Sequence, residues 1–163
     1  MKHETILYLT RAAVIAALYV VLTLLFAPIS FLEIQVRIAE ALTILPLLTP
    51  AAVPGLFAGC LLGNILGGAP LPDIIFGSLA TLLGAIGTRL LKNRRPILGT
   101  IPPIAANTVI VPLVLRYAYG LNLPIPVLML SVGIGEVISC GVLGRILYAV
   151  LYPNRKIFYL DEE

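Results

Sequence analysis

The stretch Leu7–Phe26, with the sequence LYLTRAAVIAALYVVLTLLF, decides the fold class of this chain. It carries one charged residue, Arg11, and an α-helix needs about 20 predominantly apolar residues to cross a bilayer. The rest of the chain agrees, since 60 % of its 163 residues are hydrophobic, 12 % are charged and the mean hydropathy is +1.04. A soluble domain is about half apolar and a quarter charged. We therefore predict an all-α integral membrane protein.

Proline and glycine residues divide the remainder into further apolar segments. Two of them, 36–48 and 53–66, are short for a membrane span, which favours tilting or burial among neighbouring helices. No stretch is left over for a soluble domain. We predict one membrane domain, residues 1–163, with six transmembrane helices at 7–26, 36–48, 53–66, 73–91, 98–117 and 126–151.

The basic residues indicate the orientation in the cell membrane. If the six helices alternate in direction, every Lys and Arg falls on one side except Arg37 and Arg116. Loops rich in Lys and Arg stay in the cytoplasm, so both termini are predicted to be cytoplasmic. Topology also accounts for the net charge of +3, and we expect no nucleic-acid partner, because a nucleic-acid binder clusters its basic residues on an exposed face.

The sequence lacks the residues that most catalytic mechanisms need. His3, in the terminal tail, is the single histidine, and the sequence has no G-x-x-x-x-G-K-[ST] loop for ATP. Cys60 and Cys140 lie alone in apolar segments and are expected to be packing residues. We predict no catalytic residue, cofactor or metal. Paired acids can still perform acid–base chemistry, so a small intramembrane enzyme stays open as an alternative.

Several polar residues interrupt the apolar segments. Glu136 lies about ten residues into the last segment, which at 1.5 Å per residue places it about 15 Å deep. An ionised carboxylate there costs about 2.5 to 3.5 kcal/mol, so a basic residue, a water-filled cavity or a hydrogen-bonding ligand must compensate. We predict a pocket for a small polar ligand, formed by Gln35, Arg37, Glu40, Asn64, Asp73, Asn107 and Glu136.

These groups suit a ligand rich in hydrogen-bond donors. A carboxylate has two coplanar acceptor oxygens that can meet two parallel N–H groups, as on a guanine-like edge. A second carboxylate could hold an ammonium group. Phe31, Phe76 and Tyr117 could stack on a flat base, although such aromatic residues also serve in cores and at membrane interfaces.

Simpler structural roles remain open for part of this set. Arg37 and Glu40 are three residues apart and could form an ion pair on one helix face. Asp73 follows Pro72 at the start of a segment, where a carboxylate commonly caps a helix. The strict alternation of apolar and polar residues over 32–38 fits an extended lid or an amphipathic segment at the membrane surface.

Small residues recur at four-residue spacing in two places that matter for packing. Gly55, Gly59 and Gly63 form a stripe whose default role is close helix packing within the chain. A second small patch lies near the cytoplasmic end of the first helix and could dock a partner helix. It consists of Ala12, Ala13, Ala16 and Ala17.

Four stretches of the sequence resemble one known family. They are IQVRIAEALT at 34–43, GCLLGN at 59–64, DIIFGSLATL at 73–82 and SVGIGE at 131–136. In order and spacing they resemble the queuosine-precursor transporters (QueT), which are substrate-binding S components of energy-coupling factor (ECF) importers. The resemblance spans nearly the whole chain.

The resemblance implies a six-helix S component that binds 7-aminomethyl-7-deazaguanine or a related deazaguanine. It implies a partner ECF module, made of one membrane scaffold and two ATPases, and toppling of the S component within the membrane to release its ligand. Ala12 and Ala16 match the A-x-x-x-A patch that meets the scaffold in S components. An S component for another vitamin shares this fold and stays open as an alternative.

Overall fold

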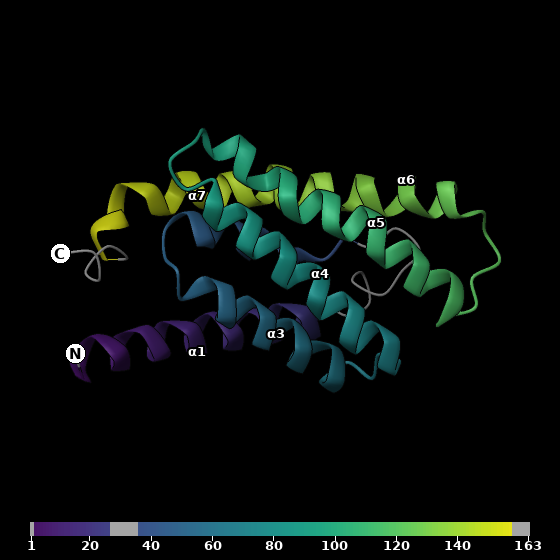
Figure 1. The fold of residues 1–163 in the computed structure, drawn as a ribbon, viewed down its shortest axis with the longest axis horizontal. Helices are drawn as coiled ribbons and strands as arrows, with labels where there is room; N and C mark the ends of the chain where they lie inside the picture. The colour runs from purple at the N-terminus through teal and green to yellow at the C-terminus, as the bar shows by residue number, and fades with distance from the viewer. Residues whose placement is uncertain (1, 27–35, 158–163) are drawn as a thin grey trace.

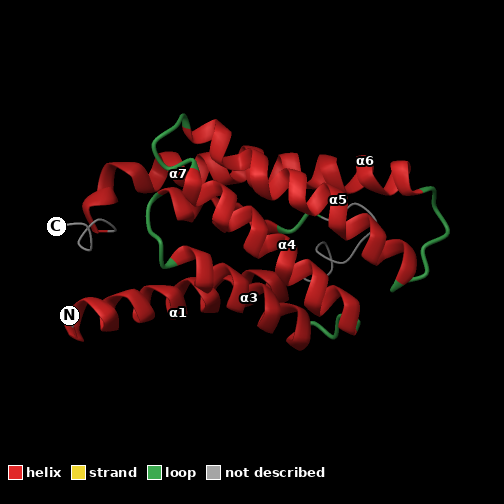
Figure 2. Cartoon of the chain, in the orientation of Figure 1, coloured by secondary structure: helices red, strands yellow, loops and turns green. Residues whose placement is uncertain are grey.

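The computed structural model describes residues 2–26 and 36–157, and within these ranges its regular elements are all helical (Figure 2). The all-α prediction is therefore confirmed. The helices are α1 (Lys2–Leu25), the 3₁₀-helix η1 (Ile38–Leu47), α3 (Ala52–Leu66), α4 (Leu71–Leu90), the 3₁₀-helix η2 (Pro96–Thr100), α5 (Ile101–Tyr117), α6 (Ile125–Glu136), the π-helix η3 (Val137–Leu143), α7 (Gly144–Leu151) and the 3₁₀-helix η4 (Tyr152–Ile157).

Four helical stretches are long and apolar enough to cross a membrane. They are His3–Leu25, Leu71–Leu90, Pro96–Tyr117 and Ile125–Arg155. The predicted second and third helices exist, but as the shorter apolar helices Ile38–Leu47 and Ala52–Leu66. All six predicted segments are thus helical, whereas the predicted number of six spans is not confirmed.

The helices run side by side as an elongated bundle (Figure 1). α1 begins and α7 ends at the same end of this bundle, where α4 also connects to α5. The α3–α4 and α5–α6 connections lie at the opposite end. This arrangement agrees with two termini on one side of a membrane, while their cytoplasmic placement stays a prediction.

The short helix η1 forms the centre of the bundle rather than a peripheral span. It packs against α1, α3, α4, α7 and η3, and all its residues from Ala39 to Leu47 are buried. The Thr43 hydroxyl donates a 2.6 Å hydrogen bond to the Glu40 carbonyl three residues earlier, in keeping with the tighter 3₁₀ turn. Since 3₁₀ runs of this length are uncommon and often mark functional segments, η1 is a natural place for a site.

The glycine stripe on α3 brings α1 close to it. A Cβ added at Gly55 would lie 2.7 Å from the Ala12 carbonyl oxygen, and one added at Gly59 would lie 2.7 Å from the Tyr19 Cβ and 3.0 Å from the Ala16 carbonyl oxygen. Only glycine permits this approach, which confirms the packing role predicted for the stripe. The contact also fixes Tyr19 in the interior, where its side chain is 1 % exposed.

Candidate functional site

The predicted ligand-binding residues that the structure describes lie in two polar groups, which are buried except at Tyr119. We call the first the Glu40 cluster and the second the Asp73 cluster. The Glu40 cluster consists of Tyr19, Glu40, Thr81, Asn107, Glu136 and Cys140, and the Asp73 cluster consists of Arg37, Asn64, Asp73 and Tyr119.

Glu40 lies on η1 and is 1 % exposed. Its Oε1 accepts hydrogen bonds from the Tyr19 hydroxyl and, at 3.3 Å, from Thr81 Oγ1. Its Oε2 accepts a longer bond of 3.5 Å from Asn107 Nδ2. These donors come from α1, α4 and α5, so three helices converge on one buried carboxylate. All three donors are neutral groups.

Glu136, at the end of α6, is buried beside Glu40. Its Oε2 accepts a 3.1 Å hydrogen bond from Cys140 Sγ, four residues later on the π-helix η3. One donor atom from each of Glu40, Glu136 and Cys140 lies within 4.8 Å of the others. Such a set of two oxygens and one sulfur has the spacing to ligate a divalent cation, and it can equally surround an organic cation. Two carboxylates this close favour a positively charged partner.

The Asp73 cluster contains a buried ion pair. Arg37 Nη2 lies 3.3 Å from Asp73 Oδ2, and the Tyr119 hydroxyl donates a 2.8 Å bond to the same oxygen. Asn64 Nδ2 donates to the Asp73 carbonyl at 3.3 Å. Asp73 Oδ1 is buried and has no hydrogen-bond partner among the described residues. This oxygen is therefore available to accept a bond from a ligand.

Tyr119 remains a neutral donor at physiological pH. Its partial burial, together with the neighbouring Asp73, raises the pKa of its hydroxyl above the ordinary value. Deprotonation would place a phenolate against a carboxylate, which the surroundings oppose. Tyr119 thus holds Asp73 in position without competing with Arg37 for its charge.

Cys60 joins the two clusters. Its Sγ accepts a 3.4 Å hydrogen bond from Thr81 Oγ1 in the Glu40 cluster and a 3.7 Å bond from Asn64 Nδ2 in the Asp73 cluster. The polar network therefore continues from one cluster to the other. Cys60 and Cys140 are buried in the core, as their predicted packing role requires, and each also has hydrogen-bond partners in this network.

Two structural alternatives for the site residues do not match the structure. Arg37 forms its ion pair with Asp73, 36 residues away, and not through the short spacing to Glu40. Asp73 does not cap α4 with its side chain, since the N-cap position is Pro70 and carries no side-chain bond. Both residues instead belong to a tertiary contact between the start of η1 and the start of α4.

The predicted set is brought together except for one member. Arg37, Asn64 and Asp73 meet in one cluster, and Glu40, Asn107 and Glu136 meet in the other. Gln35, like the aromatic Phe31 and most of the alternating segment 32–38, lies outside the described residues. The sequence interpretation missed Tyr19, Thr81, Tyr119 and Cys140 as members of the clusters. Only Cys140 carried a signal, its four-residue spacing from Glu136.

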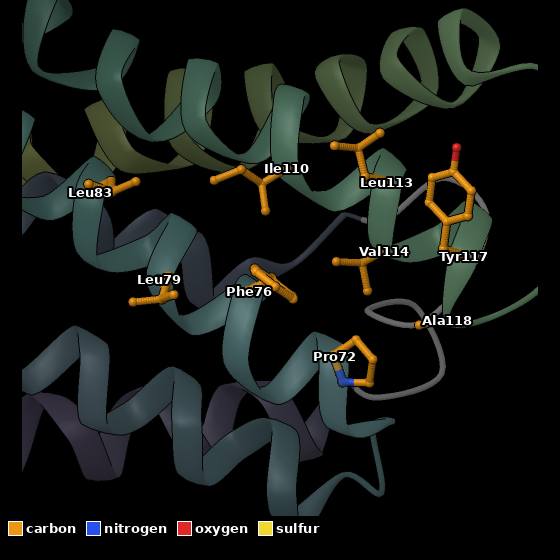
Figure 3. Close-up of a pocket in the computed structure, with 9 residues that line it drawn as sticks. All are labelled: Pro72, Phe76, Leu79, Leu83, Ile110, Leu113, Val114, Tyr117 and Ala118. Carbon is orange, nitrogen blue, oxygen red and sulfur yellow. The ribbon is translucent and has the colours of Figure 1, made fainter.

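A separate apolar cavity of about 410 Å³ lies between α4 and α5 (Figure 3). Phe76 and Tyr117, predicted as possible stacking partners, both line it, together with Leu79, Ile110 and Val114. Phe76 is 52 % exposed and Tyr117 is 76 % exposed. No residue of either polar cluster lines this cavity. The two rings therefore belong to the outer surface of the bundle.

The fold and the site together define a class of protein. The chain is a helical membrane protein with a buried polar network at its centre, an arrangement typical of binding and transport rather than of lipid-facing structure. The family model described as QueT transporter matches residues 9–153, so the chain belongs to the QueT transporter family. This membership points to a transporter rather than an enzyme. Neither the curated proteins nor the solved structures give a significant match to the chain.

A prediction follows for Gly77, which makes room for the Asp73 cluster. A Cβ at this position would lie 2.7 Å from Asp73 Oδ1 and 3.3 Å from Asn64 Nδ2. Gly77→Ala should displace the carboxylate and destabilise the chain by about 1 to 3 kcal/mol. The measurement is the thermal unfolding midpoint in detergent, followed by circular dichroism.

The matched control is Gly133→Ala on α6, where a Cβ meets only Thr108 side-chain atoms at 3.4 and 3.5 Å. This variant should unfold at or slightly above the temperature of the parent, because alanine is a better helix former than glycine and the added Cβ finds room. An unchanged midpoint for Gly77→Ala would mean that the Asp73 carboxylate can move without cost.

Proposed function

We propose that this chain is the substrate-binding S component of an ECF-type importer for a queuosine precursor, and that its preferred ligand is 7-aminomethyl-7-deazaguanine. The assignment of this ligand rests on the proximity of the Glu40 and Glu136 carboxylates in the interior. Membership of the QueT transporter family supports transport of a precursor of this kind.

The charges of the two clusters support a cationic ligand. Arg37 is matched by Asp73, whereas the described hydrogen bonds to Glu40 and Glu136 come from neutral groups. An aminomethyl group is an ammonium at neutral pH and would satisfy both carboxylates at once. A nitrile or an uncharged base would offer the two buried carboxylates no positive charge of its own.

The hydrogen-bonding edge of the base finds its partners in the same network. Asp73 Oδ1 is a buried acceptor with no bond among the described residues, and a deazaguanine edge offers parallel N–H donors. Asn64 and Asn107 each carry an amide that can donate or accept. Gln35, in the segment before η1, is a further proposed contact to the ligand.

Energy would come from partner subunits, because the sequence has no ATP-binding loop. In this proposal one membrane scaffold and two ATPases form the ECF module, and the S component topples in the bilayer to release its ligand. Ala12 and Ala16 pack against α3, so they are not free to meet a partner with their whole surface. Ala13 and Ala17 are exposed on α1, which supports this half of the predicted patch as the contact with the scaffold.

Ala13→Phe tests the docking of the ECF module. The bulky ring should hold the scaffold away from α1 and reduce ATP-driven uptake by about tenfold or more, which corresponds to about 1.4 kcal/mol of lost contact. The ligand affinity of the purified variant should stay within about twofold of the parent's, because the substitution lies outside both polar clusters. A twofold change corresponds to only about 0.4 kcal/mol of binding free energy. Uptake is measured in proteoliposomes that contain the chain and the ECF module, with radiolabelled ligand.

Ala105→Phe is the matched control, because Ala105 is an exposed alanine on another long helix, α5. It should leave uptake at the level of the parent. Ala16 is unsuitable for this test, since a large side chain there would collide with α3 and damage the fold. Full uptake by Ala13→Phe, with ATP hydrolysis intact, would contradict the proposed docking surface.

A further inference from the structure

Two adjoining hollows are lined by residues of η3, α7 and the stretch Arg95–Ile97. α7 ends at the end of the bundle where α4 connects to α5 (Figure 1). The first, of about 340 Å³, includes Arg95, Arg145 and Tyr148 in its lining. The second, of about 320 Å³, is lined by Arg145 and by apolar residues including Val142 and Ile146. Since Arg145 and Ala149 line both, the hollows form one continuous surface with a basic part and an apolar part.

Among the described residues that line it, the basic part has two cations and no anion to match them. Arg95 and Arg145 are both exposed, and neither guanidinium group forms a hydrogen bond or ion pair with another residue in the described ranges. Two guanidinium groups on one hollow repel each other unless an anion lies between them. Guanidinium groups bind phosphate oxygens through paired N–H donors, so a phosphate is the anion of matching geometry.

The apolar part lies on η3 and α7. Val142 and Ile146 are 52 % and 57 % exposed, and they lie on the candidate span Ile125–Arg155. Beyond them Tyr148 stacks on Tyr152, and the Arg155 guanidinium lies 4.2 Å from the Tyr152 ring centre. Tyrosine and arginine at the end of a span are typical of the membrane–water interface. The arginine pair is therefore placed at headgroup level, with the apolar hollow beside the acyl chains.

We propose that this surface binds an anionic phospholipid. The headgroup phosphate lies between Arg95 and Arg145, and an acyl chain lies against Val142 and Ile146. Basic pockets between transmembrane helices are known to hold anionic headgroups. The inference does not depend on the transported ligand, because none of these residues belongs to the Glu40 or Asp73 cluster. It gives the loop 91–96 a binding role in addition to its effect on topology.

The test is native mass spectrometry of the full chain released from nanodiscs that contain phosphatidylglycerol and phosphatidylcholine. The parent should retain phosphatidylglycerol in preference to phosphatidylcholine. The double variant Arg95→Gln/Arg145→Gln should retain about tenfold less phosphatidylglycerol, with the folded state checked by circular dichroism. The double variant Lys92→Gln/Arg94→Gln removes the same number of positive charges, but from residues of the α4–α5 connection that do not line the hollows, and it should behave as the parent.

Three results would overturn the proposal. Equal retention of both lipids by the parent would show that the headgroup charge is not recognised. An equal loss in the two double variants would assign the effect to general charge in the loop. Displacement of the lipid by millimolar inorganic phosphate, with no dependence on acyl chains, would make the surface a site for free phosphate.

Discussion

Replacement of Glu136 by glutamine is expected to weaken binding of 7-aminomethyl-7-deazaguanine by about 2 to 5 kcal/mol. The change keeps the size of the side chain, removes one of the two buried carboxylates and turns an acceptor into a donor. The Glu40 carboxylate then faces the ammonium alone. Isothermal titration of the detergent-purified protein should show an affinity lower by about 30-fold to a few thousandfold.

Glu4→Gln is the control for this variant. Glu4 is an exposed residue in the first turn of α1, so the same chemical change occurs far from the buried pair. Its affinity should equal that of the parent. If Glu136→Gln also binds within twofold of the parent, Glu136 has a structural role and the ammonium is held elsewhere.

Replacement of Gly59 by alanine is expected to destabilise the chain strongly. The new Cβ would lie 2.7 Å from the Tyr19 Cβ and 3.0 Å from the Ala16 carbonyl oxygen, atoms of α1 that a side-chain rotation cannot move away. The helices must separate, which moves the Tyr19 hydroxyl away from Glu40. Overpacking of this kind costs about 1 to 3 kcal/mol, and here the lost buried hydrogen bond to a charged group adds about 1.5 to 3 kcal/mol.

Unfolding of this variant can be followed through the chain's own thiols. Cys60 and Cys140 are free and buried, so a thiol-reactive dye reports their exposure on heating. Gly59→Ala should expose them at a clearly lower temperature than the parent, while Gly133→Ala should not. A parent-like midpoint for Gly59→Ala would show that α1 and α3 can separate without affecting the core.

Hydropathy and the positions of proline and glycine were sufficient to predict most of the helices. The predicted segments 53–66, 73–91 and 126–151 agree within two residues with α3, α4 and the continuous run from α6 to α7. These patterns carry no information on hydrogen-bond period, so neither the 3₁₀ form of η1 nor the π-helix η3 could be predicted. Length alone suggested that 36–48 is unusual, and its place at the centre of the bundle explains why it need not span a bilayer.

The acidic residues of the candidate site could be predicted from the sequence, because a carboxylate in an apolar segment is costly without a partner. Glu40, Asp73 and Glu136 were found for this reason. Their partners were not predictable, since the Arg37–Asp73 pair joins residues that only the folded chain brings together. Tyr19 and Thr81 were missed because one tyrosine or threonine in an apolar helix is usually an ordinary core residue. Their hydroxyl groups gain a role only beside Glu40.

The most direct test of the proposed function is isothermal titration of the purified chain with 7-aminomethyl-7-deazaguanine, its 7-cyano counterpart, guanine and a panel of vitamins. The buried pair of Glu40 and Glu136 predicts tight binding of the aminomethyl compound and at least about tenfold weaker binding of the uncharged cyano compound. Binding of a vitamin in place of the deazaguanines would keep the fold and replace the substrate. Equal affinity for the aminomethyl and cyano compounds would contradict the central claim that the acidic pair selects a cationic ligand.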